Sequence, residues 1–229
     1  MPINSNTPMK PSPDAIQLVS RIRSRLAELP LANTSSVRNL RRDFSRQLKA
    51  RTPAIVMETA LLLLEENSGT LRFFAYELVC NHKQSFESLS VADLLQLGTG
   101  INSWESVDGF GMILSGPSWR EGRIPDETIR SWAASDNLWW RRAALVSTVA
   151  LSRRGLAQDV RIVTEICTHL ATDREDMVVK ALSWALRELS KKHPKPVREF
   201  IAQHRSTLAA RVVREVENKL RTGLKTPRK

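Results

Sequence analysis

Apolar residues recur at intervals of three and four along most of the chain, which is the spacing that places side chains on one face of an α-helix. The first stripe of this kind consists of Ile16, Val19, Ile22 and Leu26. Asp14 precedes the stripe and Pro30 follows it. Since an Asp favours the cap before a helix and a proline cannot continue one, we expect a first helix from Asp14, its cap, to about Leu29.

The same periodicity predicts further helices, separated by short segments that contain Gly, Pro, Ser or Asn. The pair Gly116 and Pro117 is expected to break the chain, because neither residue favours a helix interior. No segment alternates apolar and polar residues for long enough to predict a strand, so the chain is expected to be all-α. The further helices are expected at residues 36–49, 53–67, 70–82, 90–98, 103–114, 125–135, 137–154, 157–171, 176–193, 195–204 and 208–220.

A repeat is visible in these helices, where a basic residue precedes small or apolar ones at Arg72, Arg142 and Lys180. The steps between them are 70 and 38 residues, and two periods of about 35 residues account for the longer step. The missing member then falls at or near Asp108, an acid in an expected row of bases. Periods of this length are typical of HEAT and TPR repeats. We therefore expect an α-solenoid of HEAT-like helix pairs that forms a curved arc with a basic concave face.

Length and composition favour one domain. The 229 residues suffice for a single domain or one short repeat array with a sizeable core. Residues 1–13 contain several prolines and no apolar run, so we expect a disordered tail there. A second, basic and frayed tail is expected over residues 222–229, and a single HEAT-like-repeat domain over residues 14–221.

The chain carries a large excess of positive charge, with 35 Lys and Arg against 24 Asp and Glu and a net charge of +11. Such an excess favours a polyanionic partner, most commonly nucleic acid, with anionic lipid as the alternative. No segment has the uninterrupted apolar length of a membrane span. Cys80 and Cys167 resemble small core residues of a reduced compartment, and the spacing of cysteines and histidines predicts no metal site.

Trp104 and Asp108 stand four residues apart, so on a helix an aromatic ring and a carboxylate share one face. Taken alone, such a pair is more often a core ring and a solvated acid than a site. All six tryptophans, however, fall between Trp104 and Trp184, a density that is unusual for the core of a helical repeat. Trp104 and Trp184 are candidates for an exposed aromatic wall in a basic groove, suited to packing on a sugar or a base. The core is expected to contain Trp119, Trp132 and one of the pair Trp139 and Trp140.

Three segments together resemble the HEAT-like-repeat DNA glycosylases that remove alkylated purines, the AlkD-type DNA alkylation repair family. They read SWESVD at residues 103–108, LWWRRAA at 138–144 and KALSWALRE at 180–188. Their order and spacing match the family, and the resemblance runs from about residue 71 to residue 194. Before Pro53 the chain has no Tyr or Trp, so the aromatic contact that the family makes from its first helices has no counterpart there.

The resemblance implies a monofunctional glycosylase acting on duplex DNA that contains purines alkylated at N3 or N7. Asp108 matches the catalytic carboxylate, which stabilises the oxocarbenium character of the sugar and positions water. Trp104 and Trp184 match the two rings that flank this sugar, and Arg142 matches the basic residue beside the phosphate. The base is expected to stay out of any pocket, unlike in most glycosylases. The further expected contacts to DNA are Arg72, Arg141, Lys180 and Arg187.

The same resemblance implies no cofactor, no membrane association, a monomer, and a cytoplasmic location at the bacterial nucleoid. Two other functions are compatible with the pattern. One is a non-catalytic HEAT-repeat protein that recognises damaged or bent duplex, although such a protein would be expected to have lost Asp108 or a flanking ring. The other is a solenoid that binds proteins, against which the net charge of +11 argues. Release of a free base from alkylated duplex separates the enzyme from both.

Overall fold

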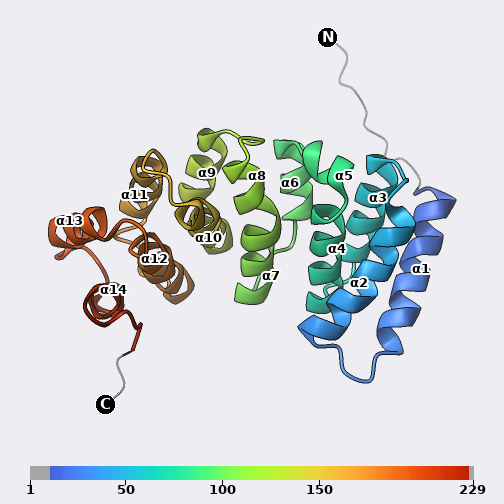
Figure 1. Cartoon of the computed structure of the whole chain (residues 1–229), viewed down its shortest axis with the longest axis horizontal. Helices are drawn as coiled ribbons and strands as arrows, with labels where there is room; N and C mark the ends of the chain where they lie inside the picture. Colours follow the sequence, from blue (N-terminus) through green and yellow to red (C-terminus); the bar gives the residue numbers. More distant parts are fainter. Residues whose placement is uncertain (1–10, 227–229) are drawn as a thin grey trace, which may run out of the picture. The chain divides into compact units, whose positions relative to one another are not determined.

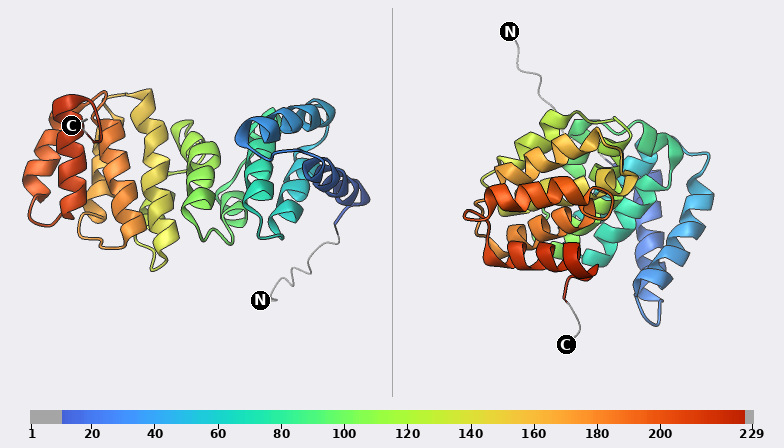
Figure 2. Two further views of the ribbon diagram at one scale, coloured as in Figure 1. Left: turned by 90° about the horizontal axis from the view of Figure 1, so that it is seen from below. Right: turned by 60° about the vertical axis from the view of Figure 1, so that its left-hand side comes forward.

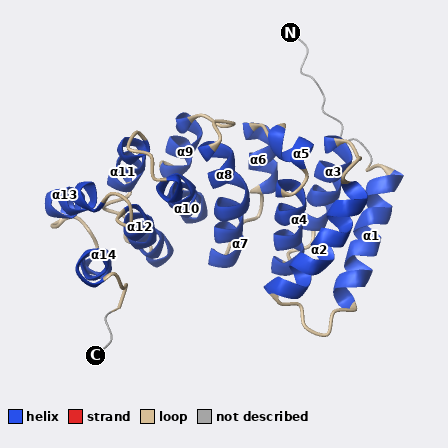
Figure 3. Ribbon diagram, viewed as in Figure 1, coloured by secondary structure: helices blue, strands red, loops and turns tan. Residues whose placement is uncertain are grey.

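The structure is a computed structural model that describes residues 11–226. Helices joined by short loops make up this part of the chain, and no strand occurs in it, which confirms the all-α class (Figures 1 and 3). The contacts divide the chain into two compact units, residues 1–88 and residues 89–229. The curved arc, its basic concave face and a single domain over residues 14–221 stay predictions.

The first unit packs its helices in pairs around an apolar core. α1 and α2 are both amphipathic, while α3 is apolar nearly all round and contacts α1, α4 and α5. α2 packs on α4, where the rings of Phe44 and Phe74 meet edge to face with centroids 5.9 Å apart. Fully buried side chains of this core include Ile22, Leu48, Leu63, Phe74 and Tyr76. The five helices are α1 (Pro13–Ala27), α2 (Thr34–Leu48), α3 (Pro53–Leu64), α4 (Gly69–Cys80) and α5 (Lys83–Glu87).

The second unit is an α-solenoid of helix pairs. α10 packs against α12 and α12 against α14, and α9, α11 and α13 follow one another beside them (Figure 2). α10 also contacts the segment that runs from α7 to α8, and this contact positions the site described below. The elements are α6 (Val91–Leu97), α7 (Trp104–Gly109), the π-helix η1 (Phe110–Ser115), α8 (Gly116–Arg120), α9 (Asp126–Ala133), α10 (Leu138–Arg154), α11 (Asp159–His169), α12 (Asp176–Leu189), α13 (Pro194–His204) and α14 (Ala210–Thr222).

The prediction for the start of the first helix was wrong in its cap. Ser12, not Asp14, caps α1, because its hydroxyl accepts the backbone N–H of Ala15 at 3.2 Å. α1 begins at Pro13, inside the segment expected as a tail, and residues 1–10 lie outside the described part, so the tail itself stays a prediction. Ile16 is 53% exposed, so the buried stripe of α1 instead includes Ala15 and Leu18.

The expected break at Gly116 and Pro117 was also wrong, because the helix continues through both residues. The π-helix η1 precedes them, and the N–H of Gly116 donates to the carbonyl of Gly111, five residues earlier. A π turn shifts the carbonyl ladder by one residue, which accommodates a proline ring that would clash with the carbonyl of an ordinary α-helix. The short helix α5 was not predicted, since its five residues are too few to show a periodicity.

Two further observations concern residues 11–226 alone. No helix among them is long and apolar enough to cross a membrane. They also contain no group of three or more His, Cys, Asp or Glu side chains placed to hold a metal ion. Burial raises the pKa of the Cys167 thiol to about 12, so this cysteine is a core residue rather than a nucleophile.

Candidate functional site at Asp108

The start of α7 is fixed by two serines that cap each other. The hydroxyl of Ser103 accepts the backbone N–H of Ser106, and the hydroxyl of Ser106 accepts the backbone N–H of Ser103. Such a capping box satisfies two donors that the first turn of a helix leaves unpaired. Trp104 is consequently the first residue of α7, and Asp108 lies one turn further along the same face.

Two glycines bring the segment after Asp108 against α10. A Cβ added at Gly111 would lie 2.6 Å from Cγ1 of Val146, and one at Gly116 would lie 3.0 Å from Cβ of Ala150. The first distance is too short for any Cβ and the second is tighter than most contacts of a Cβ, so these glycines permit the close approach of the two helices. The hydroxyls of Ser115 and Ser147 hydrogen-bond at 2.7 Å across the same contact.

The close packing of η1 on α10 brings the guanidinium of Arg142, on α10, to the carboxylate of Asp108. Nε of Arg142 donates to Oδ1 of Asp108 and Nη2 donates to Oδ2, both at 2.9 Å. The third guanidinium nitrogen, Nη1, donates to the backbone carbonyl of Met177 on α12. The Arg142 side chain is only 6% exposed, whereas that of Asp108 is 21% exposed. Arg142 thus ties α7 to α12 through the centre of the unit, and it leaves one side of the carboxylate open.

The position of Asp108 perturbs its ionisation. Burial raises the pKa of the carboxyl above its usual range, and the nearby charge of Glu105 acts in the same direction. The hydrogen bonds and the positive charge of Arg142 oppose this shift of the pKa. A bidentate guanidinium is the partner that best keeps a half-buried carboxylate charged. The charge on the Asp108 carboxylate is therefore stabilised mainly by Arg142, because burial limits its contact with water.

The two tryptophans expected at the site occupy the two helices that Arg142 connects. Trp104, on α7, is 51% exposed. Trp184, on α12, is half-buried and lies seven residues beyond Met177, which corresponds to about 10.5 Å along the helix axis. Both residues are thus at least partly exposed, while their place on a concave face and their contact with one deoxyribose stay predictions.

Two of the other tryptophans, Trp132 and Trp140, form an apolar cluster beside Asp108. Phe110, two residues after Asp108, packs against Trp132 and Trp140 with ring centroids 5.6 and 5.7 Å apart. Trp132 is 4% exposed and Trp119 is 5% exposed, which confirms the expectation that both are core residues. Trp140 contacts Trp132 at 5.0 Å and is the member of its pair that joins this cluster.

Two of the expected DNA contacts in this unit are engaged with other parts of the protein. Nε of Arg141 donates to Oδ2 of Asp173 at 2.7 Å. Nε of Arg187 donates to the hydroxyl of Ser183 at 3.2 Å, and burial lowers the pKa of this guanidinium. Both side chains are 18% exposed. Arg187 also lies 3.9 Å from Glu215 on α14. The roles of both arginines in DNA binding stay predictions.

Lys180 and Arg72 differ from these two arginines. Lys180 is exposed on α12, where Nζ lies 2.7 Å from Oδ2 of Asp176 one turn earlier. Arg72 belongs to the first unit, is 4% exposed and donates to the hydroxyl of Tyr76 at 2.9 Å. Of the two bases of the second unit that were expected in one row with Asp108, Arg142 contacts its carboxylate and Lys180 pairs with Asp176.

Sequence reasoning placed Arg142 beside a phosphate and missed its pairing with Asp108. A signal for the pair existed, because the two residues stand 34 positions apart, about one repeat. Equivalent positions of neighbouring repeats lie side by side in a solenoid. An Asp and an Arg in the same register are therefore candidates for an ion pair.

Two comparisons with known proteins bear on the site. The sequence model of a family described as "DNA alkylation repair enzyme" matches residues 32–220 of the chain. The matched part contains Trp104, Asp108, Arg142 and Trp184. A search of curated proteins gives no match.

Proposed function

The chain belongs to the DNA alkylation repair enzyme family, and from this membership and the Asp108 site we propose that it is a monofunctional glycosylase for alkylated purines in duplex DNA. The observation that carries the proposal is the half-buried carboxylate of Asp108. Arg142 holds it by two hydrogen bonds, and the exposed Trp104 lies one turn away. What distinguishes Asp108 from exposed acids such as Glu165, which also pairs with an arginine, is that its partner guanidinium is buried.

The proposed reaction needs an anion more than it needs an acid. A purine alkylated at N3 or N7 is cationic, so it leaves as a neutral base when the bond from C1′ to nitrogen breaks and the electron pair moves to the base. Positive charge then builds on the deoxyribose, and a carboxylate beside it stabilises this charge. Water adds to C1′ and releases a proton, which completes the hydrolysis without a covalent intermediate.

Asp108 is suited to this role because Arg142 binds the carboxylate from its buried side and leaves the other side accessible. Each carboxylate oxygen can accept more than one hydrogen bond, so the two bonds from Arg142 leave acceptor capacity for a water molecule. Since the guanidinium is buried and the carboxylate is partly exposed, the open side of the pair presents negative charge to a substrate. The pair is already formed in the protein alone, so Asp108 does not have to be brought into place during bond cleavage.

Trp104 and Trp184 are proposed to pack on the deoxyribose of the damaged nucleotide. An indole face attracts positive charge, so it stabilises a sugar with oxocarbenium character as well as packing on its apolar face. The exposed fraction of Trp104, 51%, leaves this ring free to make such a contact. The alkylated base is then recognised through its charge and its weakened bond, without rotation into a pocket.

Release of free base from duplex DNA tests the proposal. The substrates are matched duplexes that contain N7-methylguanine or N3-methyladenine, with undamaged duplex as the control. We expect the wild-type protein to release both alkylated bases faster than spontaneous loss and to release no normal base. Binding to the damaged duplex without release would instead identify a non-catalytic DNA-binding protein. Absence of both binding and release at low salt would favour a protein-binding solenoid.

A further inference from the structure

The helix that runs from α7 through η1 to α8 lies parallel to α10, with a constant register between the two. Three contacts between them have offsets of 34, 35 and 34 residues, namely Asp108 with Arg142, Gly111 with Val146 and Gly116 with Ala150. The residue number rises along both helices from one contact to the next, which is what parallel helices require. The same register therefore identifies the residues that face one another at the start of both helices.

Continued towards these starts, the register brings Trp139 of α10 opposite Trp104 of α7. Trp139 stands seven residues before Val146, and Trp104 stands seven residues before Gly111. Seven residues are about two turns of an α-helix, so each tryptophan lies on nearly the same face as the contact residue that follows it. Both positions are helical, since α7 begins at Trp104 and α10 one residue before Trp139. Trp139 thus belongs to the face of α10 that packs on α7.

The ring of Trp139 is not used by the fold as the core tryptophans are. Trp140 packs on two other rings, and Nε1 of Trp119 donates to Asp126 at 2.8 Å. Trp139 is half-buried, and its side chain makes neither a hydrogen bond nor a ring contact with any residue among 11–226. Its position beside the site therefore has no explanation in the aromatic cluster.

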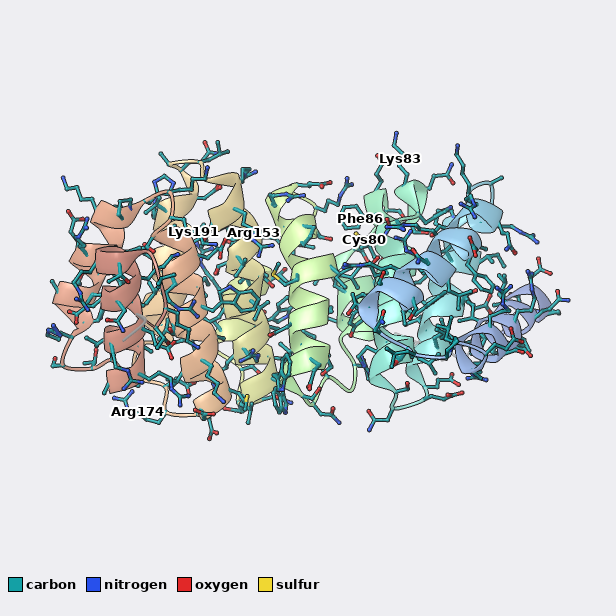
Figure 4. All side chains as sticks on the ribbon, turned by 60° about the horizontal axis from the view of Figure 1, so that its bottom comes forward. Cys80, Lys83, Phe86, Arg153, Arg174 and Lys191 are labelled. Carbon is teal, nitrogen blue, oxygen red and sulfur yellow. The ribbon has the colours of Figure 1, made fainter. Side chains whose placement is uncertain are left out.

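No cation of the described chain occupies the face of this ring. Three guanidinium groups lie over aromatic rings in residues 11–226, and none of these rings is a tryptophan. Arg174 follows Trp139 by 35 residues and precedes α12, but its Nη2 donates to the carbonyl of Thr207 at 2.7 Å. This arginine lies at the edge of the second unit (Figure 4). An indole face attracts cations, so the ring of Trp139 can receive one from outside the protein.

Glu105 supplies an unbalanced negative charge at the same end of α7. It stands three residues before Asp108, one helical turn away, and it is exposed. Its side chain makes no ion pair or hydrogen bond within residues 11–226, in a chain that has 35 cationic residues. The two carboxylates are within electrostatic range, because the charge of Glu105 raises the pKa of Asp108. Arg142 balances one of the two negative charges and leaves the other.

An open indole face and one unbalanced carboxylate together suit a flat ligand with a single positive charge. A neutral purine would gain the stacking but not the electrostatic attraction, and a metal ion prefers oxygen ligands to an aromatic ring. A purine alkylated at N3 or N7 is flat and cationic, whereas an undamaged purine is neutral. The arrangement therefore favours the damaged base through its charge.

We propose that Trp139 and Glu105 determine specificity for cationic bases, with the ring of Trp139 packing on the alkylated purine and the carboxylate of Glu105 balancing its charge. The inference rests on the proposed function and assigns to these residues a role separate from that of Asp108. Positive charge leaves the base as the glycosidic bond breaks. Contacts that recognise this charge therefore act on binding of the lesion and do not accelerate its cleavage.

Binding of two uncleavable duplexes tests the proposal without excision. One contains N7-methylguanine, and the other contains 7-methyl-7-deazaguanine, which has the same methyl group but no charge. A 2′-fluorine on both nucleotides opposes positive charge on the sugar and keeps the bases attached. Affinities are measured by fluorescence anisotropy at slightly acidic pH, where N7-methylguanine retains its positive charge. The wild-type protein should bind the cationic duplex at least about tenfold more tightly, which is the sum expected from a cation–π contact and one exposed charge.

Two variants should lower this ratio of affinities by weakening binding of the cationic duplex. For Trp139→Leu the expected loss is about two- to thirtyfold, the range that a cation–π contact spans, and Trp139→Phe should retain most of the ratio. For Glu105→Gln the expected loss is at least about twofold. Glu199→Gln is the matched control, because Glu199 is an exposed acid on α13 without an ion pair in the described chain. It should leave the ratio unchanged.

A second reading separates recognition from support of the fold. Glu105 lies in the first turn of α7, where an acid also stabilises the helix dipole, but this effect is the same for both duplexes. In excision of N7-methylguanine, both variants should raise KM and leave kcat near the wild-type value. Trp139→Leu that weakened both duplexes equally would make the ring a support of Trp104 and overturn the proposal.

The remaining outcomes distinguish this proposal from the proposed function. A wild-type protein that binds both duplexes equally, or variants that keep the wild-type ratio, would overturn the role of Trp139 and Glu105 even if alkylated bases are released. A ratio that both variants lower would support it even if no base is released, and the glycosylase activity alone would then be refuted.

Discussion

Replacing Arg142 with methionine removes the guanidinium from Asp108 while keeping an unbranched side chain in the buried position. Breaking a buried ion pair from one side typically costs about 3–5 kcal/mol, because the remaining charge is left without a partner. The Asp108 side chain is 21% exposed, so we expect a loss near the lower end of this range, about 3 kcal/mol. At about 2–4 °C per kcal/mol for a chain of this size, the melting temperature should fall by about 6–12 °C.

The assay is thermal and denaturant unfolding of four proteins, namely wild type, Arg142→Met, Asp108→Asn and the double variant. A coupling free energy of about 1–3 kcal/mol is expected, because the asparagine no longer requires a cationic partner. Lys180→Met is the matched control, since it removes an exposed cation paired with Asp176 one turn away. That change should cost about 0.3–0.5 kcal/mol. If Arg142→Met melted within about 2 °C of the wild type and the coupling were near zero, the pair would not stabilise the unit and our reading of the site would be refuted.

Three further predictions follow from the same contacts. Burial raises the pKa of Asp108, and the proposed excision requires its charged carboxylate. The rate of base release should therefore fall as the pH drops through a pKa above the usual range for Asp. A pH profile of the rate, corrected for spontaneous base loss, measures this. Trp104→Ala should slow base release but change the free energy of unfolding by only about 0.5–1 kcal/mol, because the ring is 51% exposed, and a larger loss of stability would assign it to the core. Gly111→Ala places a Cβ 2.6 Å from Val146, so the free energy of unfolding should fall by about 1–3 kcal/mol. Base release should become slower as well. A variant with unchanged stability would contradict the close contact of η1 with α10.

Most of the longer helices could be predicted from the sequence because they bury an apolar stripe whose period is visible in the residues, whereas α5 has only five residues and shows no period. Their ends were harder, since a cap depends on which side chain reaches the first free N–H. At α1 this is Ser12 rather than the acidic Asp14. The π-helix before Gly116 was not predictable, because it depends on how closely Gly111 and Gly116 pack on α10.

At the candidate site, contacts within one helix could be predicted from the sequence, whereas contacts between helices could not. Trp104 and Asp108 were predicted as a pair because both lie on one helix, where a spacing of four residues fixes their common face. The contact of Asp108 with Arg142 joins two helices and depends on the distance between them. Arg141 likewise pairs with Asp173 outside its own helix, and Arg187, besides its bond to Ser183 on α12, lies 3.9 Å from Glu215 on α14. Charge alone predicts an attraction to DNA, but it does not tell which cations are already paired within the fold.

The most direct test of the account is single-turnover excision of N7-methylguanine by Asp108→Asn, with duplex affinity measured on the same protein. Asparagine keeps the size of the side chain and removes its charge, so binding should stay near the wild-type value or become slightly tighter, because a negative charge facing phosphates is lost. Base release should fall by at least about 10²-fold, as is typical when one preorganised electrostatic group is removed. Excision at the wild-type rate would make Asp108 an ordinary partner of Arg142 and would contradict the proposed function.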